Sequence, residues 1–214
     1  MVMLVGLMLL FWPVCPSPEA DALNSAGCER ASVFDFVQAA GFFERAVQTD
    51  PGCRALRLNL VSALLHAGRL DEAHREIEQL KNETGRDPQY DYLYGMLLLR
   101  EGREPEAVDH FRAVLSVDPA DADSFCQLGL IEFHRGALEA AVRYFEEALE
   151  QDAEHATALY NEARALKALG RDARSKELME RFKALKAIQK PTTAGGMGEP
   201  YRIPGKYASL HCGG

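Results

Sequence analysis

Histidines and cysteines are the residues of this 214-residue chain with the most versatile chemistry, and it holds six of the first and five of the second. The cysteines form no Cys-x-x-Cys pair, and no histidine lies near one at the spacing of a zinc site. No two histidines stand four residues apart, so none share a helical face as paired ligands. We expect no metal site. The histidines are His66, His74, His110, His134, His155 and His211.

Catalytic motifs are absent as well. The chain contains no Gly-x-Ser-x-Gly, no phosphate-binding loop and no His-Glu-x-x-His. Carboxylates such as Glu146 and Glu147 fall at ordinary helix-surface positions. We expect no enzyme, no cofactor and no small-molecule substrate. The remaining enzymatic alternative is a site assembled from scattered residues.

Composition and charge narrow the range of partners. The chain is 47% hydrophobic and 26% charged, which is typical of a folded globular protein. Its formal net charge of -8 repels nucleic-acid phosphates and anionic lipid. We therefore expect no nucleic acid and no docking on anionic membranes.

The N-terminal segment has the pattern of an export signal. Residues 2–14 form an uncharged apolar run that is short for a membrane-spanning helix, and Ala20-Asp21-Ala22 has the small-x-small spacing of a cleavage site. The pattern predicts that residues 1–22 are a signal peptide and that the mature chain is periplasmic or secreted. Because no Lys or Arg precedes the run, the alternative is an uncleaved membrane anchor or a start codon assigned too early.

A Gly/Pro-rich segment occupies residues 190–214. Its composition opposes a helix, and its few apolar residues cannot bury enough surface to order it alone, which predicts a flexible tail. Tyr201, Ile203 and Tyr207 would allow it to act as a short docking motif. The other interpretation is a plain linker or the remnant of a further domain.

Between these ends the sequence repeats with a period of 34 residues. Gly68, Gly102, Gly136 and Gly170 fall in one column, and small or large apolar residues fill other columns at the same offset. The period predicts a solenoid domain over residues 23–189. Its units are an incomplete first repeat at 35–53, followed by 54–87, 88–121, 122–155 and 156–189.

Each unit reads as a helical hairpin, most clearly in residues 122–155. Apolar residues recur at helical spacing before Gly136, a glycine suited to ending a helix, and again after it. One hairpin cannot bury both of its faces, so neighbouring hairpins must stack into a curved solenoid. The apolar positions are Phe125 and Leu128 in the first helix, and Leu138, Ala141, Tyr144, Phe145 and Ala148 in the second.

The pattern Leu128-Gly129, Ala141, Phe145 and Ala148 resembles the tetratricopeptide repeat family, over roughly residues 35–189. The resemblance implies an all-α, right-handed superhelical solenoid of helix-turn-helix repeats that binds another protein or a peptide. Several positions depart from the pattern, and the polar residues of the last unit suit a terminal cap. The departures are Leu60-Val61, Glu162-Ala163 and Ser175-Lys176, and the cap residues are Lys176, Glu180, Arg181 and Lys183.

The resemblance also implies that the first helix of each hairpin lines a concave binding wall. Family members that clamp chaperone tails use Lys, Arg and Asn clusters there, and here only Asn59, Asn161 and Arg164 are similar. We therefore expect an extended or helical peptide with apolar anchors. The alternative is that some of these residues merely pack between helices. The candidate partner-binding residues are Asn59, Tyr92, Met96, Gln127, Leu130, Tyr160, Asn161 and Arg164.

Cys28 and Cys53 stand on either side of the incomplete first repeat. In an oxidising compartment they would form a candidate disulfide, and otherwise they are two unpaired thiols. Cys126 is interpreted as a small packing residue. Together the features favour an exported adaptor or envelope assembly factor, with a membrane-anchored or regulatory part of a larger protein as the alternative.

Overall fold

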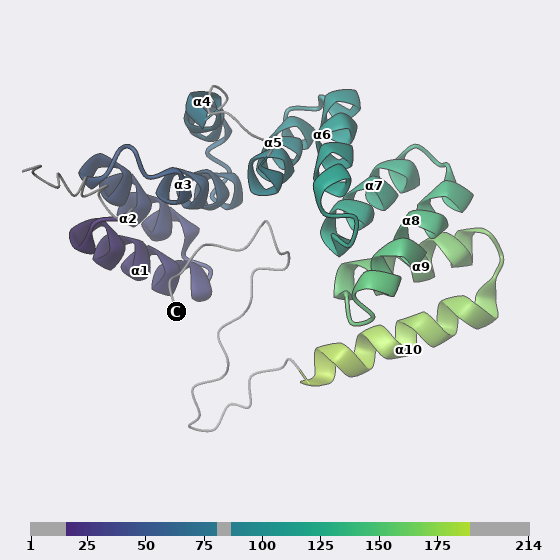
Figure 1. Cartoon of the computed structure of the whole chain (residues 1–214). Coiled ribbons are helices and arrows are strands. Elements are labelled where there is room, and N and C mark those ends of the chain that lie inside the picture. Colours follow the sequence, from purple (N-terminus) through teal and green to yellow (C-terminus); the bar gives the residue numbers. More distant parts are fainter. Residues whose placement is uncertain (1–15, 81–86, 189–214) are drawn as a thin grey trace, which may run out of the picture.

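A computed structural model describes residues 16–80 and 87–188 of the chain. This part contains ten α-helices and no strand, and the helices follow a curved path from α1 to α10 (Figure 1). The predicted all-α fold is confirmed. In chain order the helices are α1 (Pro18–Ser32), α2 (Phe36–Thr49), α3 (Arg54–His66), α4 (Leu70–Leu80), α5 (Pro88–Arg100), α6 (Glu104–Val117), α7 (Ala122–His134), α8 (Leu138–Gln151), α9 (Ala156–Ala168) and α10 (Asp172–Ile188).

The helices pair in sequence into five hairpins. Each odd-numbered helix packs against the even-numbered helix that follows it, and the even-numbered helices α2, α4, α6 and α8 pack against the first helix of the next hairpin. First helices also contact each other, as α3 does with α5 and α7 with α9. Stacking of this kind buries both faces of a hairpin, which no hairpin achieves alone.

The turn inside each hairpin places one residue in the left-handed region. The four glycines of the 34-residue column fill this position with φ of 73° to 80°. Phe34 fills it in the first hairpin, with φ of 63°. A side chain in this conformation costs about 1–2 kcal/mol, so the first turn is strained where the other four are not.

Close approach within a hairpin depends on a second glycine column. A Cβ on Gly129 would lie 2.6 Å from the ring of Phe145, and a Cβ on Gly27 would lie 2.6 Å from the ring of Phe43. Gly27 of α1 therefore has the same role as Gly129 of α7, which makes α1 the first helix of a full repeat.

This finding corrects the expected start of the solenoid. The first repeat was expected to be incomplete and the domain to begin at residue 23, but α1 begins at Pro18 and supplies the missing helix. Ser17 caps α1 by accepting a hydrogen bond from the N–H of Ala20, which is fully buried. A cut after Ala22 would fall inside α1. The apolar run and the Gly/Pro-rich segment lie outside the described residues.

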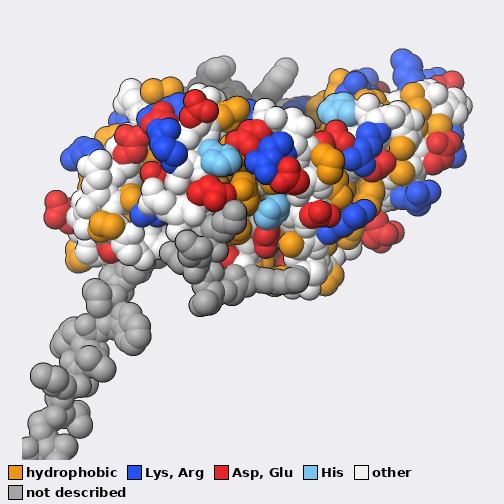
Figure 2. All heavy atoms as spheres, turned by 90° about the horizontal axis from the view of Figure 1, so that it is seen from above, with side chains coloured by type: hydrophobic (Ala, Val, Ile, Leu, Met, Phe, Trp, Pro, Cys, Tyr) orange, Lys and Arg blue, Asp and Glu red, His pale blue; other side chains and the backbone are white. Residues whose placement is uncertain are grey.

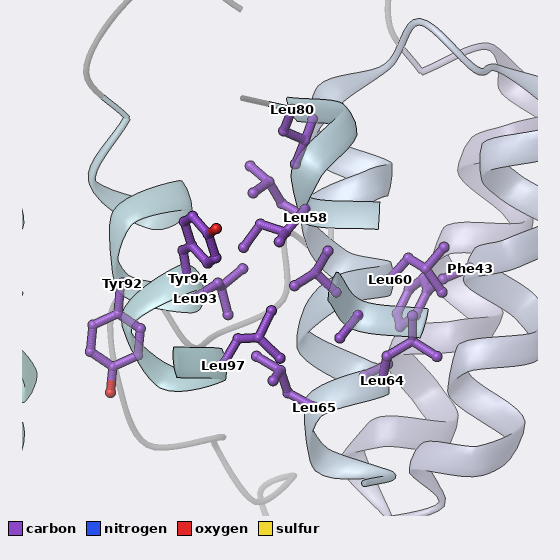
Figure 3. Close-up of a cluster of buried hydrophobic side chains, with 14 of the residues drawn as sticks. Phe43, Leu58, Leu60, Leu64, Leu65, Leu80, Tyr92, Leu93, Tyr94 and Leu97 are labelled. Carbon is purple, nitrogen blue, oxygen red and sulfur yellow. The ribbon is translucent and has the colours of Figure 1, made fainter. Parts of the chain in front are cut away.

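The core runs continuously through the first hairpins and continues as two smaller clusters around α7 to α10. Figure 3 shows how α5 joins α3: Leu93 and Leu97 point toward Leu58 and Leu65. All four are buried. Burying one leucine stabilises a fold by about 2 kcal/mol, so contacts of this kind hold the row of hairpins together.

The last described hairpin has a polar outer face, as the sequence predicted. Ser175 takes the place of the small residue of other repeats, and its hydroxyl donates to the carbonyl of Ala163 at 2.7 Å. The four predicted cap residues of α10 are exposed. Basic and acidic side chains are interspersed over the face seen in Figure 2. The described residues form surface ion pairs such as Arg69–Glu72 at 2.6 Å.

Candidate functional site: the concave wall

Two rows of residues run along the odd-numbered helices, each with the 34-residue spacing of the repeat. We call them together the wall, because they occupy the positions at which the family places its binding surface. The first row is Asn24, Leu58, Tyr92, Cys126 and Tyr160, and the second is Cys28, Ser62, Met96, Leu130 and Arg164.

The wall is buried in its N-terminal half. Leu58, Ser62 and Tyr92 are at most 3% exposed, and so is the neighbouring Asn59. The Asn59 side-chain amide donates to the side-chain oxygen Oδ1 of Asn24 at 2.7 Å, joining α3 to α1. Asn59 and Tyr92 were predicted to face a partner, and in this structure neither offers an open surface.

Tyr92 connects three helices. Its ring packs edge-on against Phe111 with centroids 5.7 Å apart, and its hydroxyl accepts a hydrogen bond from the Gln127 amide at 3.4 Å. Figure 3 shows its ring pointing away from the leucines between α3 and α5. Burial raises the pKa of this phenol well above its usual range. The side chain of Gln127, a predicted partner-binding residue, is therefore hydrogen-bonded to Tyr92. Both residues contribute to packing between repeats.

A buried histidine–carboxylate pair lies behind the wall, and sequence reasoning missed it. His155 caps α9: its Nδ1 accepts from the N–H of Ala158 at 3.1 Å, and its Nε2 lies 3.1 Å from Asp123 Oδ1. Because Nδ1 accepts, Nε2 carries the proton and donates to Asp123. His155 falls at the same position of the 34-residue repeat as Asp87 and Asp121, which also cap helices. This spacing was the signal in the sequence from which the capping role of His155 could have been predicted.

A cysteine of the wall follows Asp123 by three residues. Cys126 is the nearest thiol of the wall in sequence, and it is buried, which raises its pKa far above the usual range and keeps it protonated. Within the described segments no group of three His, Cys, Asp or Glu side chains is placed to hold a metal ion. Other histidines form single pairs, His74 with Glu101 and His110 with Asp91, each at 2.8 Å.

The C-terminal half of the wall is open. Tyr160 is 39% exposed and Arg164 is exposed. The Arg164 guanidinium lies over the ring of Phe133 at 4.8 Å and over that of Tyr160 at 5.5 Å, and Tyr160 packs on Phe182 at 5.2 Å. We call these four residues the α9 patch. It brings one cation and three aromatic rings together at the surface.

Asn161 is buried beneath the α9 patch, where it contacts Arg164, and it is not part of the exposed surface. It is 5% exposed, and its amide donates to the carbonyl of Thr157 at 2.8 Å. Its side-chain oxygen accepts from Arg164 at 3.0 Å, which fixes the guanidinium. Of the other predicted wall residues, Met96 and Leu130 are partly buried.

A buried carboxylate sits next to this half of the wall. Glu162 is 1% exposed, and neither of its carboxylate oxygens has a hydrogen-bond partner among the described residues. Burial, and then the charge of Glu146, raise its pKa to about 7. The equivalent residue in the preceding repeat is Leu128, so Glu162 puts an ionisable group at an apolar position.

Two of the described cysteines are oxidised. Cys28 and Cys53 are each disulfide-bonded, whereas Cys126 is free. No helix among residues 16–80 and 87–188 is long and apolar enough to cross a membrane.

Tetratricopeptide repeat family models match the sequence over residues 32–97, 92–153 and 126–187. The chain belongs to the tetratricopeptide repeat family. The matches agree with the repeat positions and with the two glycine columns of the structure.

Relatives and solved structures of this family resemble the chain at low identity. Superkiller protein 3 of Saccharomyces cerevisiae is 29% identical over 89 residues, or 42% of this chain, and the match spans only 6% of that protein. The type IV pilus biogenesis factor PilW superposes with a TM-score of 0.69 at 16% identity, covering 81% of this chain and 80% of PilW. YrrB, described as having an unusual peptide-binding site, gives a TM-score of 0.53 at 18% identity and covers 79% and 89%.

Proposed function

We propose that this protein is a scaffold or adaptor that binds a segment of another protein along the wall. The observation that carries the proposal is the α9 patch, where Tyr160 and Arg164 are exposed on a first helix. Aromatic and Arg side chains are the residues that contribute most to protein interfaces. Membership of a repeat family, and the likeness to the peptide-binding YrrB, support the same function.

The chemistry of the wall indicates the kind of segment. Arg164 is the single cation in the two rows, so a cluster that clamps a chaperone-type carboxylate is missing. Its guanidinium keeps free N–H donors while it lies on two rings. We expect an extended or helical peptide that places an apolar or aromatic anchor on Tyr160 and an acidic group near Arg164.

The location of the scaffold is also a proposal. The apolar run at residues 2–14 supports export, and disulfide-bonded cysteines are typical of oxidising compartments. The role would then be assembly of an extracytoplasmic or envelope structure. If the apolar run is not removed, it would anchor the same scaffold at a membrane. Intact-mass measurement of the native protein distinguishes the two outcomes.

Peptide selection tests the binding function even while the natural partner is unidentified. The full chain is immobilised and challenged with a random-peptide phage library, and selected peptides are measured by calorimetry. Arg164→Ala should weaken their binding at least about tenfold, equivalent to about 1.4 kcal/mol, because a charge contact and part of the aromatic surface are lost.

Arg143→Ala is the matched control, because Arg143 is exposed on α8, away from the wall. It should leave binding unchanged. If the control weakens binding and Arg164→Ala does not, the partner binds the outer helices and the proposed site is wrong.

A further inference from the structure

The last described hairpin differs from the others in its charge. Residues 156–188 contain eight Lys or Arg and four Asp or Glu, whereas residues 16–80 and 87–155 together contain 11 and 26. The net charge is therefore +4 on this hairpin and -15 on the described residues that precede it. A positive surface on an otherwise acidic protein attracts acidic ligands and repels basic ones.

Three of the basic residues stand next to the aromatic rings of the α9 patch. Tyr160, Arg164 and Lys167 follow one another at spacings of four and three residues, so they share one stripe of α9. On α10, the Lys186 ammonium group lies over the ring of Phe182, 6.0 Å from its centroid. The positive charge of the hairpin thus extends along the aromatic surface on both helices.

The charges of these three residues are available to a ligand. Arg164, Lys167 and Lys186 are exposed, and none of them forms an ion pair with a carboxylate of the described residues. Lys183 of the same hairpin, by contrast, pairs with Glu180 at 2.7 Å. A basic group without an internal partner breaks no ion pair when it binds a carboxylate of another molecule, so its full attraction contributes to binding.

The two helices of this hairpin, α9 and α10, run in opposite directions. Near the turn, the hydroxyl of Ser175 donates to the carbonyl of Ala163 at 2.7 Å. Further from the turn, the rings of Tyr160 and Phe182 pack together with centroids 5.2 Å apart. Residue numbers fall along α9 while they rise along α10, which defines an antiparallel pair. We call Tyr160 and Phe182 the ring pair.

The ring pair lies between two of the cations. Arg164 is four residues after Tyr160, about 6 Å along α9, and Lys186 is four residues after Phe182, about 6 Å along α10. Because the helices are antiparallel, these steps point in opposite directions and separate the two residues by about 12 Å along the axes. The side-chain contacts follow the same order, with 5.5 Å from Arg164 to the first ring, 5.2 Å between the rings and 6.0 Å from the second ring to Lys186.

We propose that this hairpin binds an extended segment of another protein in which two acidic residues flank an aromatic one. The inference rests on the proposed binding function of the wall and names the partner of the same site. An extended chain advances about 3.3 Å per residue, so acidic residues four positions apart span about 13 Å, which matches the separation of Arg164 and Lys186. The aromatic residue midway between them packs on the ring pair. The helix α10 is then part of the binding surface as well as the cover of α9.

A synthetic peptide with the sequence Gly-Glu-Ala-Phe-Ala-Glu-Gly tests the pattern on the full chain. Its fluorescently labelled form is titrated with the protein and followed by fluorescence polarisation. The matched control is Gly-Ala-Glu-Phe-Glu-Ala-Gly, which has the same composition and charge but places its two carboxylates too close together to reach both cations. The first peptide should bind at least about threefold more tightly, because an exposed charge contact contributes up to about this factor or slightly more.

Charge reversal at Lys186 tests the contribution of α10. Lys186→Glu should weaken binding of the first peptide at least about tenfold, because an attraction is replaced by a repulsion. Lys176→Glu is the control: Lys176 is exposed on the same helix, off the stripe of Phe182 and about 15 Å along the axis from Lys186, which exceeds the Debye length at physiological salt. This variant has the same net charge and should change binding less than about twofold.

The two charges must also be coupled. Replacing one glutamate of the first peptide by glutamine should weaken binding to the natural chain but not to the Lys186→Glu variant. Equal affinity for the two peptides, equal effects of the two charge reversals, or no binding at millimolar peptide overturns the proposal. Library-selected peptides that lose affinity in Arg164→Ala would in that case still support the scaffold function, so the two failures are distinguishable.

A second copy of this chain is the competing occupant, because its preceding hairpins are acidic. Light scattering of the natural chain over a range of concentrations detects it. We expect no dimer that depends on Lys186. A dimer that forms with the natural chain and with Lys176→Glu, but is lost in Lys186→Glu, would show that the hairpin binds another copy and would overturn the proposal.

Discussion

Replacing Glu162 with glutamine tests whether a buried charge weakens the last repeats. The pKa of Glu162 is raised from 4.5 to about 7, mainly by burial, so the native chain binds a proton that the unfolded chain has released between these values. The free energy of unfolding therefore falls as the pH rises. The stabilisation that comes from the neutral Glu162 carboxyl is complete below about pH 4.5 and is lost above about pH 7.

The full shift corresponds to at most about 3 kcal/mol. Arg174 and Arg181 offset part of the charge, and water screens it further, so we expect about 1–2 kcal/mol. Glu162→Gln keeps the size of the side chain and removes its charge. The variant should differ little from the natural chain near pH 5 and be more stable than it near pH 8 by this amount.

Urea unfolding of the full chain, followed by helical circular dichroism at pH 5 and pH 8, measures the difference. Glu147→Gln is the control, because Glu147 is an exposed residue on α8 and its replacement should have the same small effect at both pH values. If Glu162→Gln changes stability equally at both pH values, or lowers it at pH 8, the buried charge is not what limits stability.

Three further substitutions test the packing of the repeats. Phe34→Gly should raise the free energy of unfolding by about 1 kcal/mol, because glycine adopts the left-handed conformation without strain. Thermal unfolding measures the change, and a lower melting temperature would show that the exposed ring of Phe34 is needed for stability. Gly129→Ala should lower it by about 1–3 kcal/mol, since the new Cβ would meet Phe145, and no loss in urea unfolding would contradict that close contact. Ser175→Ala should cost about 1 kcal/mol by leaving the Ala163 carbonyl without this donor, and equal melting temperatures would show that water replaces it.

The fold could be predicted because its determinants recur. The glycine that ends each first helix and the small residue beneath each aromatic ring appear at a fixed period, so several weak signals combine into a strong one. The first helix escaped detection because Phe34 replaces glycine in that column and an apolar run preceding α1 resembles an export signal. Gly27, 16 residues before Phe43, repeats the spacing of Gly129 and Phe145 and was the available signal.

The wall could be predicted in position but not in exposure. The period places Tyr92 and Tyr160 in the same row, yet one is buried between α5 and α7 and the other is open on α9. Exposure depends on which neighbouring side chains cover a residue, and those neighbours differ from repeat to repeat.

The matching caps of α5 and α7 bear on how such a chain changes over evolutionary time. Asp87 accepts hydrogen bonds from the N–H groups of Gln89 and Tyr90, and Asp121 accepts one from Ser124 at the same position of the next hairpin. Loss of residues 88–121 would join Asp87 directly to Ala122 and leave an aspartate at the start of the next helix. Duplication of the same stretch would do likewise. Unequal recombination can thus shorten or lengthen the binding surface by one hairpin while each new junction keeps its capping residue.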